Sequence, residues 1–347
     1  MASKKPTMRD VAKQAGVALG TVDRYLNGNV AVTKKKSDAI RKAIEELQYV
    51  PNKAAKVLSL GASVDIGIVY PYVERAFWRQ IEKGIERASK EYGASGLQVH
   101  PVHIDRYDAE LQLQAMNELA AKGMQGIAIV PTHESHLNAA ISQLTDQGIH
   151  VVTFDSDAPL SRRFRFIGED NFQGGEIAAR IMAMLIHEKG EIAVFRFHSN
   201  LYAIQQRIMG FGQKIAGYPD AYVAAEYKFD GSPADNEQRL KQIIQEYFPA
   251  DDIKGIFCTN NGELVASVLR NAGFGRRYKI VSFDFLDDTR EFLQNGDISA
   301  VVCTDLEKQG YLAVRSLYER IVNGTIPEQA YRYTRHQVIF KEMLDKG

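Results

Sequence analysis

Residues 8–28 of the 347-residue chain read MRDVAKQAGVALGTVDRYLNG, and their apolar spacing predicts two short helices separated by a tight turn. The first helix carries its apolar residues on one stripe, and Asp10 three positions after Thr7 indicates a capping box at its start. Gly16 interrupts the stripe, and a second helix is expected from about Ala18. Two short helices joined at a glycine turn are typical of a helix-turn-helix unit.

A third helix is predicted at about residues 34–47, with Thr33 as its N-cap, and it would brace the first two. The inward-facing residues expected on the second and third helices are Val22, Tyr25, Leu26, Ile40, Ile44 and Leu47. Residues 1–60 hold 12 lysines and arginines against 5 acidic residues, although the whole chain carries 43 of each. A basic head on an acidic body indicates a polyanionic partner for the head alone.

The stretch DVAKQAGVALGTVDRYLNG at residues 10–28, followed by ELQYVPNKAAKVLSLG at 46–61, closely resembles the DNA-binding head of the LacI family of bacterial transcription regulators. This resemblance implies that the second helix lies in the major groove of operator DNA and presents its first residues to base edges. Arg24 matches the family's base-reading arginine, which would pair with guanine. The other implied base-facing residues are Ala18, Leu19, Gly20 and Asp23, and the implied phosphate contacts are Thr7, Thr21, Asn27 and Lys34.

Two positions leave alternatives open. Asp23 stands where the family usually has serine, and its carboxylate could accept a hydrogen bond from cytosine or hold Arg24 in place. The resemblance also implies a hinge helix that begins near Asn52 and is too short to be stable alone. Leu58 matches the family's minor-groove wedge, which would bend the duplex, and its alternative is an ordinary linker residue.

From Val64 onward, short apolar strands alternate with helical patterns, which predicts parallel sheets covered by helices on both faces. The number of elements indicates two sheets. The predicted strands are 64–71, 96–104, 126–131, 150–155, 191–197, 222–229, 255–260, 279–284 and 300–305. The predicted helices are 77–92, 108–122, 134–147, 171–188, 202–216, 234–247, 262–273 and 306–322.

The expected fold is therefore an α-helical helix-turn-helix head joined to a two-lobed α/β core. We expect the head at residues 1–48, the hinge at 49–62 and the core at 63–347. The first lobe should take about 63–166 and 300–328, and the second about 167–299 and 329–347. Two heads are needed to read two half-sites, so a homodimer is expected.

Polar and aromatic residues follow most of the predicted strands. Ligands of such folds bind outside the carboxyl ends of the strands, and aromatic rings beside Asp, Asn and Arg are typical of a sugar site. Turn chemistry is the alternative for each residue alone. The residues concerned include Tyr70, Tyr72, His103, Thr132, Asp155, His198, Asn260, Asn261, Asp284, Thr304 and Asp305.

The core also resembles type I periplasmic sugar-binding proteins, particularly the ribose-binding branch. That resemblance implies ligand contacts from Phe77, Trp78, Asp155, Arg207, Asn261 (with Asn260 as second choice) and Asp284. Three positions depart from the branch: Arg75 replaces asparagine, Ser156 replaces arginine and Asp305 replaces glutamine, so the ligand is not simply ribose. Arg75 with Arg207 would favour an anionic sugar, unless Arg75 pairs with a nearby carboxylate.

The chain shows no nucleophile elbow, zinc-protease motif or phosphate loop, so no enzyme and no cofactor are predicted. His133 and His136 have no further metal ligand near them in sequence, and Cys258 and Cys303 are expected to be buried thiols. Neither a membrane span nor a signal peptide is predicted, which makes the cytoplasm the expected location.

These observations predict a sequence-specific regulator of carbohydrate-use genes, expected to be a repressor. Operator DNA is its expected partner, and a monosaccharide or derivative would control its DNA affinity. The alternative is a sugar-binding or sugar-processing protein whose head does not read DNA. Three carboxylates, Asp155, Asp284 and Asp305, keep glycoside hydrolysis open as a chemistry.

Overall fold

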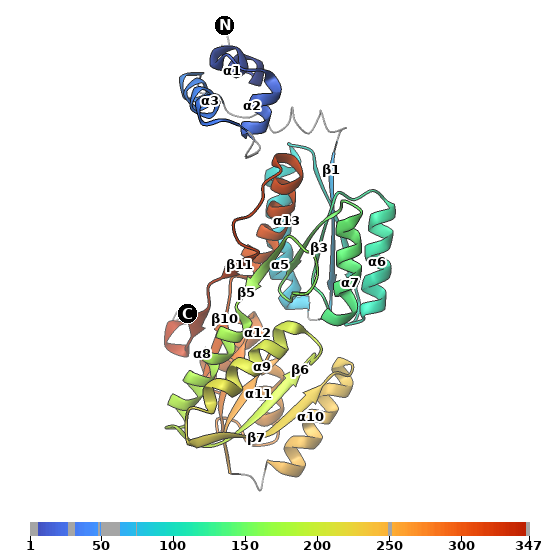
Figure 1. Cartoon of the computed structure of the whole chain (residues 1–347). Coiled ribbons are helices and arrows are strands. Elements are labelled where there is room, and N and C mark those ends of the chain that lie inside the picture. Colours follow the sequence, from blue (N-terminus) through green and yellow to red (C-terminus); the bar gives the residue numbers. More distant parts are fainter. Residues whose placement is uncertain are drawn as a thin grey trace.

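The structure, a computed structural model, describes residues 6–26, 32–47, 49, 63–73, 75–248 and 252–344 (Figure 1). The side chains of Asp23 and Arg75 lie outside the described part of the chain. The positions predicted at Asn27, Asn52 and Leu58 also lie outside it, as does the predicted hinge apart from residue 49.

The head is the predicted three-helix unit, formed by α1 (Met8–Ala15), α2 (Leu19–Leu26) and α3 (Lys34–Leu47). The predicted capping box is confirmed, because the Thr7 amide donates to the Asp10 carboxylate at 2.8 Å and the Asp10 amide to the Thr7 hydroxyl at 3.4 Å. Gly16 ends α1 at φ 64°, a left-handed conformation that suits glycine. The head core contains Val11, Ala12, Val22, Ile40, Ala43 and Tyr49.

The first lobe is built on a six-stranded parallel sheet in the order β11-β5-β4-β3-β1-β2. Its strands are β1 (Val64–Pro71), β2 (Leu97–Ile104), β3 (Gly126–Ile129), β4 (His150–Phe154), β5 (Arg165–Glu169) and β11 (Tyr331–Thr334). Helices α5 (Arg75–Gly93) and α13 (Leu306–Asn323) pack on one face of this sheet. Helices α6 (Ala109–Ala121) and α7 (Glu134–Asp146) pack on the other.

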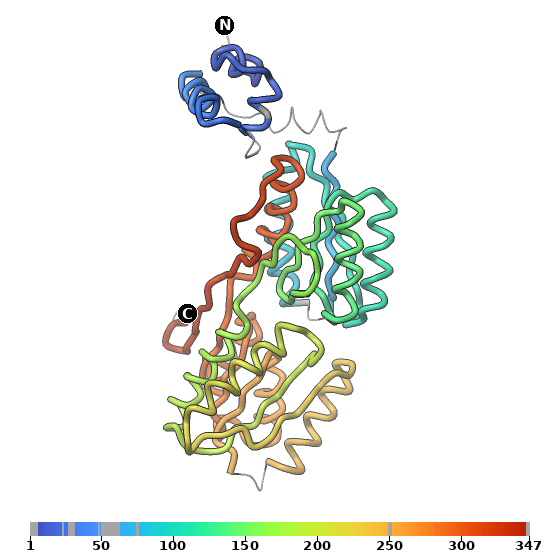
Figure 2. Tube along the Cα trace, viewed as in Figure 1, coloured from blue at the N-terminus to red at the C-terminus, as the bar shows by residue number. Residues whose placement is uncertain are grey.

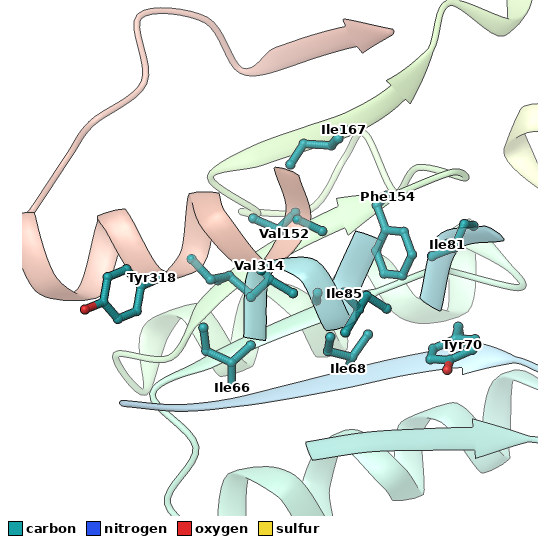
Figure 3. Packing of buried hydrophobic residues seen from close by; sticks show 14 of the residues in the cluster. Ile66, Ile68, Tyr70, Ile81, Ile85, Val152, Phe154, Ile167, Val314 and Tyr318 are labelled. Atoms are coloured by element: carbon teal, nitrogen blue, oxygen red, sulfur yellow. The ribbon is translucent and has the colours of Figure 1, made fainter. Parts of the chain in front are cut away.

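The buried strands of this lobe are continuous apolar runs, as expected of a sheet covered on both faces. Figure 3 shows Ile66 and Ile68 of β1 facing Ile85 of α5 and Val314 of α13. Tyr318 of α13 also lies in this core and is 0% exposed.

The second lobe repeats this architecture with the strand order β12-β10-β9-β8-β6-β7. Its strands are β6 (Lys189–Phe197), β7 (Asp220–Phe229), β8 (Ile253–Cys258), β9 (Lys279–Phe283), β10 (Ala300–Cys303) and the antiparallel β12 (Gln337–Ile339). Helices α8 (Asn171–Leu185) and α9 (Tyr202–Ile215) cover one face. The other face is covered by α10 (Pro233–Tyr247), α11 (Gly262–Asn271) and α12 (Asp287–Asn295), and the 3-10 turn η1 (Lys341–Met343) follows β12.

The chain passes between the lobes three times, and the three crossing segments run together on one side of the molecule (Figure 2). The crossings follow β5, β10 and β11. One hydroxyl connects them: Thr334 donates to the Gly168 carbonyl at 3.0 Å and accepts from the Thr304 hydroxyl at 2.5 Å. The three crossings therefore form one hydrogen-bonded hinge.

The lobe boundaries differ from those we expected at each crossing. Residues 300–328 are expected in the first lobe, but Ala300–Cys303 pairs with β9 and belongs to the second sheet. Residues 167–169 and 331–334, expected in the second lobe, pair within the first sheet. Four elements, β5, β11, β12 and α12, were not predicted, because they are short or largely polar and the pairing of the three strands is set by distant strands.

Both predicted core thiols, Cys258 and Cys303, are buried and unpaired. Burial raises the pKa of both, to about 12 for Cys303. Within the described ranges, no helix combines the length and the apolar character needed to cross a bilayer.

In each lobe, two helices meet at glycines. In the first lobe, a Cβ on Gly84 would lie 1.8 Å from the Glu307 carbonyl oxygen. In the second, a Cβ on Gly175 of α8 would lie 2.1 Å from the Arg207 carbonyl oxygen of α9. The α8 and α9 backbones are therefore in direct contact, and this contact fixes the position of Arg207 in the lobe.

Gly175→Ala is expected to lower the free energy of unfolding by about 1–3 kcal/mol, because the new methyl group overpacks a backbone contact. Gly212→Ala is the matched control on α9, since no atom lies within 4 Å of its Cβ. That change should raise stability by up to about 1 kcal/mol through helix propensity. Denaturant unfolding of both variants measures the difference, and equal effects would contradict the close helix contact.

Candidate functional site

A cavity of about 360 Å³ lies between the lobes, outside the carboxyl ends of both sheets. Its size suits a small molecule. The first lobe contributes Ala76, Phe77, Trp78, Arg79, Tyr107 and Asp155. The second contributes Leu201, Ala203, Ile204, Arg207, Asn260, Asn261, Glu263, Asp284, Leu286 and Asp288.

The structure brings together six of the residues predicted for the ligand site. These are Phe77, Trp78, Asp155, Arg207, Asn261 and Asp284, and the second-choice Asn260 lines the cavity as well. They come from the ends of strands and the starts of helices in both lobes, so no part of the sequence contains the site alone.

Three of the lining residues have left-handed backbones: Asp155 at φ 61°, Asn261 at φ 52° and Asp284 at φ 68°. Non-glycine residues rarely adopt this conformation, and Asp and Asn tolerate it best. Asp155 follows β4 of the first sheet and Asp284 follows β9 of the second. The two aspartates therefore occupy equivalent bends on opposite sides of the cavity, where backbone strain is typical of binding sites.

Arg207 is a buried cation held by groups from several elements. It donates from Nε to Asn171 at 2.9 Å and from Nη1 to the Thr259 carbonyl at 2.6 Å. Its Nη2 forms a buried ion pair with Glu169, and the guanidinium lies over the Phe283 ring. These contacts hold the guanidinium in place on every side except the side that faces the cavity.

The acidic and basic groups around Arg207 influence its charge and one another. Burial alone would raise the pKa of Glu169, but the charges of Arg207 and His336 lower it to about 2. His336 Nε2 lies 3.3 Å from Glu169 Oε2, although no hydrogen bond joins them. Burial opposes the charge on Arg207 as well, and the carboxylates of Glu169, Asp284 and Asp155 outweigh it and raise the pKa of Arg207.

Two residues expected at the ligand site do not line this cavity. Tyr72 stacks on His103 with ring centroids 4.6 Å apart. Asp305 is exposed and accepts from the Lys308 amide at 2.8 Å, which makes it the N-cap of α13. The structure therefore does not bring Asp305 together with the other two carboxylates considered for hydrolysis. Arg75 begins α5 next to the lining residue Ala76.

Sequence reasoning missed several lining residues and the buried partner of Arg207. Arg79, Tyr107, Glu263 and Asp288 lie within helices or loops, where no pattern in a single sequence marks the inward side. Glu169 ends β5, and recognising that strand would have placed another carboxylate at a strand end. His133 and His136 lie side by side, and in the described part of the chain no three His, Cys, Asp or Glu residues are grouped to hold a metal ion.

The exposed face of α2 carries several of the predicted DNA-binding residues. Leu19 is 41% exposed, and a Cβ on Gly20 would point into open space, with no neighbouring atom within 4 Å. Arg24 is exposed and donates from Nε to the Gly20 carbonyl at 3.0 Å, so its side chain lies along this face. Ala18, which precedes α2, and Lys34 at the start of α3 are exposed too.

Two of the residues predicted to contact DNA phosphates have side chains that are covered or already hydrogen-bonded. The Thr21 side chain is largely covered, at 8% exposure, and Thr7 forms the capping box of α1. A side chain that is covered or already bonded offers less to DNA, although the exposed start of a helix can still bind phosphate through backbone N–H groups.

A helix-turn-helix head and a two-lobed core with a central cavity define the class of DNA-binding regulators that carry a sugar-binding domain. The sequence matches bacterial regulatory proteins of the lacI family over residues 7–52. It matches the periplasmic binding protein domain over residues 66–325. The chain belongs to the lacI family, with a periplasmic binding protein domain as its core.

Curated relatives and solved structures agree with this assignment. HTH-type transcriptional regulator GntR of Escherichia coli (strain K12) is 27% identical over 267 residues, which cover 75% of each chain. HTH-type transcriptional regulator IdnR of the same strain is 25% identical and covers 93% of this chain and 94% of IdnR. GanP, a glucose-galactose binding protein from Geobacillus stearothermophilus, has a similar structure with a TM-score of 0.74 at 26% identity, covering 81% of this chain and 99% of GanP.

Glu169→Gln is expected to destabilise the protein by about 3–5 kcal/mol near neutral pH, because it leaves the buried charge of Arg207 without its partner. Because the folded-state pKa of Glu169 is lowered, its contribution to stability is present above the ordinary glutamate pKa of 4.5 and is lost as pH falls toward about 2. Unfolding free energies of the variant and the wild type should therefore converge in acid.

The control is Glu307→Gln, which removes the acidic partner of an exposed ion pair with Arg87. Exposed pairs contribute up to about 1 kcal/mol, so this variant should stay close to the wild type. A loss at Glu169 no larger than the loss at Glu307, measured by urea unfolding at neutral pH, would show that the buried pair does not hold the site.

Proposed function

We propose that this protein represses carbohydrate-use genes by binding operator DNA as a homodimer, and that a monosaccharide or derivative in the cavity changes its DNA affinity. The observation that carries the proposal is that one chain combines two features. Its head presents the exposed face of α2, and its core holds a cavity lined by aromatic, carboxylate, amide and guanidinium groups. Relatives named as a ribose operon repressor and a sucrose operon repressor support it.

For DNA recognition, we assign the base-reading role to Arg24 on α2. Its guanidinium is exposed and can leave the Gly20 carbonyl to meet guanine, which accepts two hydrogen bonds from one arginine. Leu19 and Gly20 present an apolar side chain and a bare backbone on the same face, which suits contact with a thymine methyl group.

For ligand recognition, we assign the stacking surface to Phe77 and Trp78, whose rings meet edge to face with centroids 5.0 Å apart. Asp155 and Asp284 would each accept hydrogen bonds from sugar hydroxyls, one from each lobe. Arg207 and Asn261 would donate from the second lobe. A ligand that bonds both aspartates holds the two lobes together.

Control of DNA binding follows from the difference between open and closed lobes. A ligand changes an equilibrium only by binding one arrangement more tightly than the other. Closure would rotate the lobes about the hinge that Thr334 ties together, and in a dimer this rotation would change the spacing of the two heads. The coupling free energy of such systems is typically about 1–3 kcal/mol.

We place the protein in the cytoplasm and assign it no enzymatic activity. Its curated relatives are transcriptional regulators and binding proteins, which supports a binding role. A regulator must also reach the chromosome to act.

Arg24→Ala is expected to reduce the preference for the operator over scrambled DNA by roughly tenfold or more, since a bidentate arginine–guanine pair contributes about 1–3 kcal/mol. The operator is first selected by the wild-type protein from a pool of randomised duplexes. Titrations at several salt concentrations then separate specific from non-specific binding.

The matched control for charge is Arg41→Ala, because Arg41 is exposed on α3 and pairs with Asp38. This change should weaken binding to both DNAs equally. An Arg24 variant that keeps the wild-type preference would remove this residue from base reading.

Asp155→Asn and Asp284→Asn are each expected to abolish the ligand-induced rise in melting temperature found for the wild type. A screen of pentoses, hexoses, polyols and sugar acids identifies the ligand, because a hundredfold excess over Kd stabilises the folded protein by about 2.7 kcal/mol. Asp287→Asn, on exposed surface outside the cavity, is the control and should keep the full shift. A shift with a purine or an amino acid and with no sugar would contradict the sugar assignment.

A further inference from the structure

The two lobes contact each other beside the cavity through a pair of stacked rings. Tyr107 lies in the loop between β2 and α6 of the first lobe, and His198 lies in the loop between β6 and α9 of the second. The ring centroids are 3.9 Å apart, and the angle between the ring planes is 25°. Because the rings belong to different lobes, the stack holds only while the lobes are close together.

We infer that the stack of Tyr107 on His198 stabilises the closed arrangement of the lobes and thereby raises the affinity of the cavity for its ligand. In this arrangement His198 is a positioning residue, which acts on the ligand through Tyr107 and through closure. The inference rests on the proposed function, in which a ligand binds between lobes that close. It adds that part of the affinity comes from a contact between protein groups.

His198 does not belong to the surface that the ligand would contact. Tyr107 lines the cavity of about 360 Å³, whereas His198 lines a second cavity of about 190 Å³ and not the first. The two cavities are neighbours, since Tyr107 and Leu201 line both. A change at His198 therefore leaves the lining of the ligand cavity as it is.

The backbone of the second lobe holds His198 in place for the stack. Its φ is 54°, its amide donates to the Phe229 carbonyl at 3.1 Å, and its carbonyl accepts from the Leu201 amide at 3.0 Å. A left-handed backbone is uncommon outside glycine, and such residues gather at functional sites. The ring therefore stands on a fixed turn, which limits the entropy lost when it stacks.

Tyr107 is anchored in the same way on the first lobe. The next residue, Asp108, caps α6 by accepting from the Glu110 amide at 2.9 Å and the Leu111 amide at 3.1 Å. Arg106 Nε donates to the same carboxylate at 3.1 Å. The stack thus joins two anchored segments, so its contact energy acts on the relative position of the lobes.

A hydrogen bond also crosses between the lobes. Ser156 follows β4 of the first lobe, and its hydroxyl oxygen accepts from the amide of Ala203 on α9 at 3.4 Å. This distance is long for a hydrogen bond, whereas aromatic pairs stabilise beyond the area that they bury. We therefore assign the larger effect on closure to the stack.

The test measures ligand affinity in the full-length protein by calorimetric titration. D-ribose, D-arabinose, D-glucose and D-galactose are the probes, and the tightest binder is used for every variant. His198→Asn removes the ring and keeps a residue type that tolerates a left-handed backbone. It should weaken binding roughly two- to tenfold, as expected of one aromatic pair when the ligand binds the closed lobes.

Repeating this change in two other backgrounds separates positioning from a local structural role. In Tyr107→Ala no ring is left to stack on, so His198→Asn should have no further effect on affinity. In Tyr107→Phe the ring remains and the hydroxyl is lost, so His198→Asn should weaken binding as it does in the wild type. An equal loss in the Tyr107→Ala background and in the wild type would overturn the inference.

His136→Asn is the matched control. His136 lines the same second cavity, but its ring contacts His133 of the same lobe, with centroids 4.2 Å apart. This variant loses an imidazole without losing a contact to the other lobe, so its affinity should stay within error of the wild type.

The outcomes separate this inference from the proposal on which it rests. Unchanged affinity in His198→Asn, or an equal loss in His136→Asn, would overturn the role of the stack and leave the ligand site intact. If no sugar binds while a purine or an amino acid does, the sugar assignment fails. The same set of variants titrated with that compound then tests the stack.

Discussion

The ion pair between Arg207 and Glu169 is the interaction on which the rest of the core depends. A guanidinium that is almost wholly buried persists only with a charged partner and with hydrogen-bond acceptors for its N–H groups. Glu169 supplies the charge from the end of β5, at the point where the chain first leaves the first lobe. Asn171 and Thr259 supply the acceptors, and the glycine contact between α8 and α9 sets the position of the arginine.

This arrangement connects the cavity directly to the hinge. Arg207 lines the cavity, and its partner Glu169 lies on the first crossing. His336 lies on the third crossing, with its Nε2 3.3 Å from the Glu169 carboxylate. Thr334, two residues before His336, bonds the first and second crossings together. A ligand that changes the position or charge environment of Arg207 therefore acts on groups within the hinge, without a long chain of intermediate contacts.

Much of the fold could be predicted from the sequence, because local patterns determine it. The capping box at Thr7, the turn at Gly16 and the apolar strands from Val64 each depend on residues a few positions apart. The crossings could not be predicted in the same way, since β5, β11 and β12 are defined by pairing with distant strands. At the site, residues at strand ends were found by position, whereas Glu263 and Asp288 lie on helices whose rotation toward the cavity only the packing decides.

The central claim is that the cavity and the DNA-binding head share one conformational equilibrium. Operator affinity measured with and without saturating sugar, and sugar affinity measured with and without operator, test this claim most directly. The account predicts that both pairs of measurements change by the same factor, roughly 5- to 150-fold, because coupling between two binding sites is reciprocal. A protein that binds both operator and sugar, while neither ligand changes its affinity for the other, would contradict it.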